Sequence, residues 1–133
     1  MKPENHITAF EEHKKNIFIW ALEINGLEKS QRTIGLNASR GIVELLLLYL
    51  EEKNKISPGF QLNHRWFKSD SIFQRLPEFP KKKQIVSEMV KLENISEALS
   101  YGSPKPIEEI RKAVELFKEI ENEINKLRGV EIE

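Results

Sequence analysis

The chain contains no cysteine among its 133 residues, and the motifs of several common functional classes are also missing. Without thiols, disulfide bonds, thiol nucleophiles and cysteine-ligated zinc are excluded. No HExxH sequence occurs, and neither GxGxxG nor GxxxxGK[ST] is present, so the common zinc-protease motif and both common phosphate loops are absent. The spacing of His6, His13 and His64 does not favour a metal pair. We therefore expect no metal and no cofactor.

Long hydrophobic runs are missing as well. The longest apolar stretch, residues 42–50, covers nine positions and includes Glu44, whereas a membrane-spanning helix needs about 20 residues. The first residues, MKPENHITAFEEHKK, are charged and do not resemble a secretory leader. We expect a cytoplasmic protein without a membrane segment. A charged fraction of 32 % suits a thermophile, although the nine asparagines argue against such an origin.

The formal net charge is zero, but the charges are unevenly distributed along the chain. Residues 54–92 carry eight basic and three acidic side chains, whereas residues 93–133 carry six basic and ten acidic ones. A basic segment of this kind suits a polyanionic partner. The acidic end is typical of the solvated face of a helix.

The spacing of the apolar residues predicts an all-α fold in one domain, 1–133. We expect an up-and-down bundle of four long helices plus one short helix. Residues 42–50 are apolar nearly all round, so their helix should be the buried central one. The long helices are expected over residues 6–25, from within 28–33 to about 53, 81–101 and 106–128, and the short helix over 71–76.

Three small residues, Gly35, Ala38 and Gly41, recur at three-residue spacing in the second helix. Glycine inside a helix costs up to about 1 kcal/mol relative to alanine, which indicates a packing reason for keeping two of them. Either another helix or another subunit can approach closely at such a face. From this face we predict a homodimer.

The stretch 60–68, FQLNHRWFK, alternates aromatic and basic residues in a predicted loop. Phosphates attract cations and unstacked bases pack on aromatic rings, so this composition suits single-stranded RNA or a nucleotide. Alternatively, the aromatic residues only anchor the loop, and on this interpretation Trp66 is a core residue whose loss costs stability. We favour the anchor for Trp66. The candidate ligand residues are His64, Arg65, Trp66, Lys68, Lys81, Lys82 and Lys83.

A second candidate site is a buried polar groove formed by Arg40, Glu44 and Ser96. Glu44 stands alone within the buried run, and we expect Arg40, four residues earlier, to pair with it. Ser96 shares one helix face with apolar neighbours.

Two segments resemble the HEPN superfamily, a group of small helical domains that accompany minimal nucleotidyltransferases or act as RNases. Residues 38–44, ASRGIVE, are similar to the second long helix of that family, where small and polar residues precede a glutamate and an apolar run. Residues 92–102, LENISEALSYG, are similar to its later helix, which ends in an arginine-to-histidine motif followed by Tyr-Gly. The resemblance implies a helical bundle, a homodimer and a small nucleotidyltransferase partner.

The RNase motif of that family places a histidine four to six residues after an arginine. Here Ser96 stands at the arginine position, and Ser100 or Tyr101 stands at the histidine position. Without both groups, metal-free RNA cleavage loses its proton-transfer and charge-stabilising side chains. We therefore predict no catalytic residue and a non-catalytic module that dimerises and binds a nucleotidyltransferase, a nucleotide or RNA.

Two alternatives remain open. The first is a metal-independent RNase of a toxin–antitoxin system with a displaced active site, for example one using His64 and Arg65. The second is a plain helical protein-interaction domain with no nucleic-acid role.

Overall fold

The computed structural model describes residues 3–130, and within that range every regular element is a helix. The predicted all-α bundle of four long helices is confirmed, with some boundaries shifted by a few residues. The long elements are α1 (Pro3–Lys15), which continues as the π-helix η1 (Asn16–Asn25), then α2 (Gln31–Glu52), α3 (Lys82–Tyr101) and α4 (Ile107–Arg128). Three short 3₁₀ helices connect them: η2 (Leu27–Lys29), η3 (His64–Lys68) and η4 (Asp70–Arg75).

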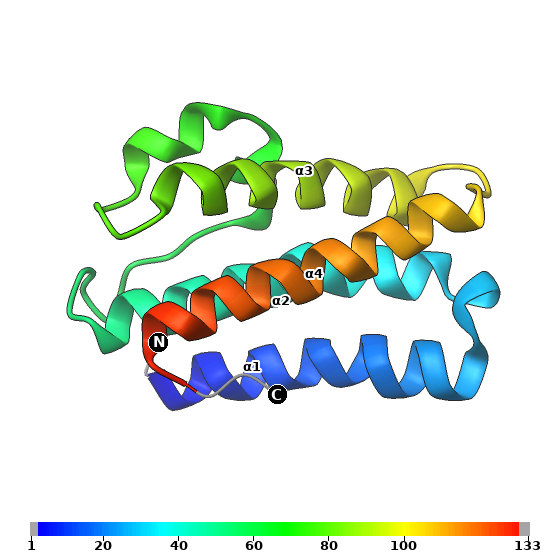
Figure 1. Cartoon of the computed structure of the whole chain (residues 1–133), viewed down its shortest axis with the longest axis horizontal. Helices are drawn as coiled ribbons and strands as arrows, with labels where there is room; N and C mark the ends of the chain where they lie inside the picture. The colour runs from blue at the N-terminus through cyan, green and yellow to red at the C-terminus, as the bar shows by residue number, and fades with distance from the viewer. Residues whose placement is uncertain (1–2, 131–133) are drawn as a thin grey trace.

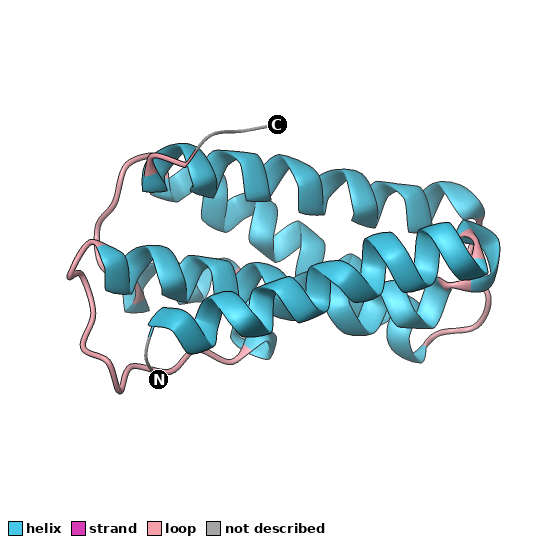
Figure 2. Ribbon diagram, turned by 90° about the horizontal axis from the view of Figure 1, so that it is seen from below, coloured by secondary structure: helices cyan, strands magenta, loops and turns pink. Residues whose placement is uncertain are grey.

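Successive long helices run in opposite directions, and the connections lie at the two ends of the bundle (Figure 1; Figure 2). Helix α2 contacts α1, α3 and α4, so it is the central helix. Its apolar run is buried from Leu45 to Leu50, as the sequence predicted. By length and composition α2 passes the test for a membrane span, yet 78 % of its most apolar window is buried in the bundle.

The small-residue face of α2 is occupied by neighbouring helices of the same chain. A Cβ atom on Gly35 would lie 2.8 Å from the backbone nitrogen of Ser100 in α3. One on Gly41 would lie 3.0 Å from His13 in α1 and 3.2 Å from Phe117 in α4. Ala38 is fully buried. This face therefore holds the helices of one chain together and is not exposed to a second subunit.

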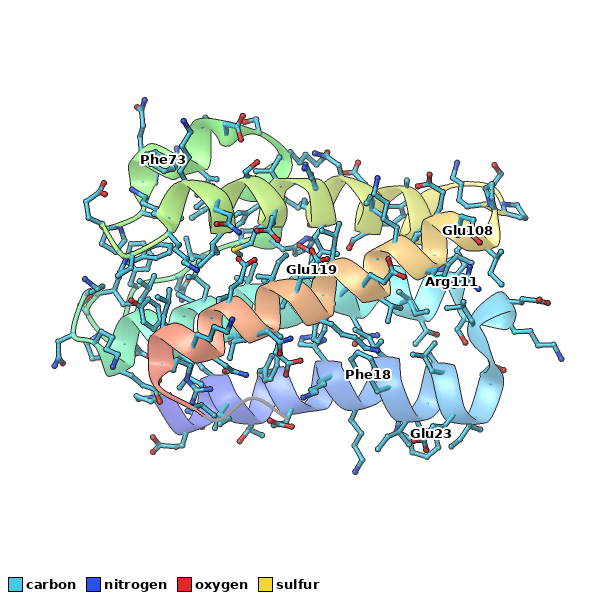
Figure 3. The ribbon with its side chains drawn as sticks, in the orientation of Figure 1. Phe18, Glu23, Phe73, Glu108, Arg111 and Glu119 are labelled. Carbon is cyan, nitrogen blue, oxygen red and sulfur yellow. The ribbon has the colours of Figure 1, made fainter. Side chains whose placement is uncertain are left out.

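The first predicted helix differs from expectation in its second half. Residues Asn16–Asn25 form a π-helix rather than continuing as an α-helix, and Gly26 ends the element with φ +92°. Positive φ is easily adopted by glycine, which explains the Asn25-Gly26 stop. Phe18 points from η1 toward α4 and packs against Phe117, whereas Glu23 lies on the outer side (Figure 3).

The segment between α2 and α3 contains two short helices where one was predicted. Asn63 caps the unpredicted η3, because its side-chain oxygen accepts a hydrogen bond from the backbone nitrogen of Arg65 at 2.8 Å. Phe67 in η3 and Ile72 in η4 are fully buried and anchor the segment. Trp66 is 43 % exposed, so the expectation that it is a core anchor was wrong. Because neighbouring side chains in a short helix point in different directions, only one of the pair can face the core.

Candidate functional site

Helices α2 and α3 approach closely where Gly35, near the start of α2, faces Ser100, near the end of α3, and η3 lies against both helices. The three elements enclose a pocket of about 140 Å³, which we call the small pocket. The close approach depends on Gly35, which itself lines the pocket. The polar side chains that line the small pocket are Ser39 and Arg40 from α2, His64, Arg65 and Lys68 from η3, and Glu93, Ser96, Glu97, Ser100 and Tyr101 from α3.

His64 is held at both of its ring nitrogens. Nδ1 lies 2.9 Å from Oε1 of the buried Glu93, and Nε2 accepts a hydrogen bond from Nε of Arg40 at 3.2 Å. Arginine can only donate, so Nε2 is the acceptor and the imidazole proton belongs on Nδ1, toward the carboxylate. This arrangement fixes the tautomer and the orientation of the ring. It also supplies the buried Glu93 carboxylate with a partner.

Ser96 contributes a hydroxyl that is not used elsewhere. Its Oγ is buried and has no hydrogen-bond partner among the residues that the structure describes. The neighbouring Ser100 hydroxyl donates to the backbone oxygen of Ser96 at 2.8 Å, so it does not satisfy the Ser96 side chain. A buried hydroxyl without a partner is costly, and a ligand in the small pocket would remove that cost.

The positive charges of the small pocket are only partly neutralised. Nζ of Lys68 lies 3.0 Å from Glu97, in a partly exposed pair that contributes little to stability. Within residues 3–130, no carboxylate pairs with Arg40 or Arg65. Arg40 instead donates from Nη1 to the backbone oxygen of Leu36 at 2.8 Å. Two guanidinium groups therefore remain available for an anion.

A larger depression of about 540 Å³ adjoins the small pocket and shares Arg40, His64 and Arg65 with it. Apolar groups contribute to its wall, including Val43, Leu62 and Trp66. The guanidinium carbon of Arg75 lies 5.3 Å from the ring centroid of Trp66. The larger depression therefore combines an aromatic wall with cations. Its other polar lining residues are His13, Glu44, Gln61 and Asn63.

The expected pair between Arg40 and Glu44 does not form. Arg40 turns toward His64, while Glu44 accepts from Nδ1 of His6 at 2.7 Å. The other ring nitrogen of the buried His6 lies 3.1 Å from Glu51, one heptad further along α2. The prediction was wrong because α1 supplies a closer partner, which spacing within one helix does not reveal.

Most of the residues predicted to bind a ligand do lie together. His64, Arg65 and Lys68 line the small pocket with Arg40 and Ser96, and Trp66 and Glu44 line the larger depression. The buried polar groove and the loop site, which the sequence treated separately, are thus parts of one surface region.

Lys81, Lys82 and Lys83 do not belong to this region. Lys82 is buried, and its Nζ donates to the backbone oxygen of Leu76 at 2.8 Å, pairs with Glu78 and lies 4.1 Å from the ring centroid of Phe73. Lys83 lines a separate hollow beside Phe73. Glu93 lies eleven positions after Lys82 in α3, a distance of about 16 Å along the helix. The three lysines are adjacent in sequence to the site segment but lie at the other end of α3.

Sequence reasoning missed Glu93 and His13 as members of the site. A signal for Glu93 exists, because a glutamate on the apolar side of a predicted helix must have a buried partner. The identity of that partner depends on how η3 packs on α3, and local periodicity does not determine this packing.

Searches with the sequence and the structure found no matching family model, no matching curated protein and no matching solved structure. Among the described residues, no group of three or more histidine, aspartate or glutamate side chains is arranged to hold a metal ion.

Proposed function

We propose that the protein is a non-catalytic module that binds a nucleotide unit, free or within single-stranded RNA, in the two adjoining depressions. The phosphate occupies the small pocket and the base lies against Trp66 in the larger depression. The observation that carries this proposal is the buried Ser96 hydroxyl. Among residues 3–130 it has no hydrogen-bond partner, and it lines a pocket with two guanidinium groups that no carboxylate of that range pairs with.

The chemistry of the two depressions supports this ligand. Guanidinium groups bind phosphate oxygens through directional hydrogen bonds, and a hydroxyl adds a further donor. An exposed tryptophan offers a stacking face to any base, and stacking of this kind contributes about 1–3 kcal/mol per base. Because Arg40, His64 and Arg65 line both depressions, a phosphate and its attached nucleoside can occupy them together.

The HEPN resemblance is part of the proposal. The all-helical bundle agrees with the fold that the resemblance implies, and both similar segments contribute residues to the site: Arg40 and Glu44 from the first, Glu93 and Ser96 from the second. On this proposal, a small nucleotidyltransferase is the protein partner. Coexpression and copurification with such an enzyme encoded beside this chain tests that assignment.

Fluorescence anisotropy with short single-stranded RNA, measured as a function of salt, tests the binding proposal. Arg65→Ala should weaken binding and reduce the salt slope by about one unit, because one phosphate contact is lost. Ser96→Ala should weaken binding without loss of thermal stability, since its hydroxyl has no partner in the described part of the chain. Lys83→Ala is the matched control, because it removes one cation outside both depressions and should change neither quantity.

Two outcomes would change the assignment. If the parent protein binds neither RNA nor a nucleoside monophosphate at low salt, the plain interaction domain becomes the better description. If only the monophosphate binds, the ligand is a free nucleotide.

A second candidate function is metal-independent RNA cleavage, favoured by the contact between Glu93 and His64. With its proton fixed on Nδ1, His64 presents Nε2 as a base beside Arg40. Arg40 would have to turn its Nε–H from His64 to the phosphate. Nε2 would then take the proton of a 2′-hydroxyl while the 2′-oxygen bonds to phosphorus and the bond to the 5′-oxygen breaks. The 5′-oxygen leaves with a proton from water. The products are a 2′,3′-cyclic phosphate and a 5′-hydroxyl. Incubating RNA with the protein in EDTA, with His64→Ala as control, decides between binding and cleavage.

A further inference from the structure

Three of the large exposed apolar side chains of the described chain lie within six residues of each other in η1. Ile19 is 37 % exposed, Trp20 is 55 % exposed and Ile24 is 64 % exposed. We call these three residues the apolar strip. The opposite side of η1 packs inward, where Ile17 and Ala21 are buried. The apolar strip is therefore not needed for the core of this chain.

The π-helical backbone is the reason that these side chains form one strip. In an α-helix successive residues turn by about 100°, so Ile24 would project about 140° away from Ile19, five positions earlier. In a helix with i→i+5 hydrogen bonds, residues four and five positions apart lie over one another. The positions 15, 19, 20 and 24 then share one side. π-helical segments are uncommon and are often found at functional positions.

Opposite charges stand at the two ends of the apolar strip. Lys15 precedes it by one turn, and Glu23 lies beside Ile24 on the outer side of the bundle (Figure 3). Both side chains are exposed, and neither forms an ion pair within residues 3–130. The nearby Lys14, in contrast, is paired with Glu121 at 2.6 Å. The strip is thus apolar in the middle and oppositely charged at its ends.

We propose that a second copy of this chain packs on the apolar strip, antiparallel and related by a two-fold axis near Ile19 and Trp20. Such an axis places the Lys15 of one copy beside the Glu23 of the other, twice. The surface is therefore complementary to itself in charge as well as in apolar character, as a two-fold interface requires. This surface differs from the Gly35, Ala38 and Gly41 face, which is buried inside each copy.

The strip covers only a few side chains, so the interface lies at the small end of protein–protein contacts. We expect a dissociation constant in the micromolar range, corresponding to about −8 kcal/mol. The dimer should therefore form and dissociate with protein concentration rather than being permanent.

Sedimentation velocity over a concentration series tests the proposal. Trp20→Glu should weaken self-association by at least tenfold, because it buries a charge in the apolar centre. Lys15→Glu and Glu23→Lys should each weaken self-association, because like charges then meet across the interface. The double variant should restore self-association, because each contact again joins opposite charges. If the double variant restores self-association, the single variants acted on a specific interface and not on folding. Circular dichroism of each variant checks that the fold is intact.

The absence of cysteine allows a second, independent measurement. Ile19→Cys should be linked efficiently to a second copy by a short bismaleimide, whereas Glu115→Cys, at an exposed position on α4, should not. A parent protein that stays monomeric at roughly 100 µM, where a micromolar complex is almost fully formed, would overturn the proposal. Equal crosslinking at positions 19 and 115 would also overturn it.

Discussion

Phe67 and Trp66 are neighbours in the chain, yet they have opposite environments. Both belong to η3, but Phe67 is fully buried, while Trp66 is partly exposed and lines the larger depression. Stability and ligand binding are therefore assigned to two different aromatic residues of the same helix. Burial identifies Phe67 as an anchor of the segment, whereas stacking of a base on Trp66 is part of the proposed function.

This assignment predicts opposite results for the two alanine variants. Phe67→Ala should lower the free energy of unfolding by about 3–5 kcal/mol, because it removes a large buried ring. Trp66→Ala should leave the melting temperature nearly unchanged and weaken RNA binding by about 1–3 kcal/mol. Chemical denaturation and anisotropy on both variants provide the comparison. A large loss of stability in Trp66→Ala would contradict the assignment.

Glu123 on α4 is a carboxyl with an unusual proton affinity. Burial raises its pKa to about 7 from an ordinary value of 4.5, and repulsion by and hydrogen bonding with Glu88 add to the shift. The folded state thus keeps a proton that the unfolded chain has already released. Stability contributed by this group is complete below about pH 4.5 and is lost as the pH rises through about 7.

Glu123→Gln should therefore raise the melting temperature at pH 8 and have little effect near pH 4.5. Glutamine keeps the shape and can hydrogen-bond to Glu88 without carrying a charge. Glu115→Gln, at an exposed position of the same helix, is the matched control and should change neither value. Melting curves of both variants at both pH values provide the measurement. A change in the melting temperature of Glu123→Gln that is the same at both pH values would contradict this prediction.

At the level of elements, the contact between α2 and α3 determines whether the small pocket exists. Glycine at position 35 lets the two helices approach until an added Cβ would lie 2.8 Å from the Ser100 backbone nitrogen. Backbone atoms cannot move aside as a flexible side chain can. The same glycine therefore sets both the helix spacing and the width of the pocket.

Gly35→Ala should destabilise the protein despite the higher helix propensity of alanine. Propensity favours alanine by about 1 kcal/mol, whereas overpacking typically costs about 1–3 kcal/mol. RNA binding should weaken as well, because α3 must move relative to Arg40. Gly59→Ala is the control, since nothing lies within 4 Å of its added Cβ. Denaturation midpoints for both variants test this, and a stabilised Gly35→Ala would show that the helices separate easily.

For the whole molecule, the two proposed surfaces belong to different elements. The small pocket lies among α2, α3 and η3, whereas the apolar strip consists of exposed side chains of η1. Neither the strip residues nor Lys15 and Glu23 line either depression. A dimer formed through the strip therefore leaves both sites open.

Self-association and RNA binding should consequently vary independently. Trp20→Glu should bind RNA with the affinity of the parent, and Arg65→Ala should dimerise as the parent does. Anisotropy and sedimentation on the same two preparations provide the test. If Trp20→Glu loses RNA binding in proportion to dimerisation, the site requires both copies and the independence predicted here is wrong.

The sequence by itself determined the four long helical segments and which of them is central. The apolar run at Leu45–Leu50 is buried on all sides because no face of that helix is polar enough for water, and this follows from composition alone. The end of the first helical element at Gly26 also follows locally, from the positive φ that glycine adopts. The basic loop segment also brought His64, Arg65 and Lys68 together as candidates, and these three residues do line one pocket.

Only the tertiary structure decided which polar groups meet. Arg40 binds His64 rather than Glu44, Glu93 orients His64, and Lys82 is buried beneath η4 instead of facing a ligand. Each of these contacts joins residues from different segments of the chain. Which segments pack together depends on the tertiary fold, and the spacing of residues within one helix does not encode it. The π-helix at Asn16–Asn25 was not indicated by the apolar spacing either. It packs against α2 and, through Phe18, against α4, and it leaves Ile19, Trp20 and Ile24 exposed.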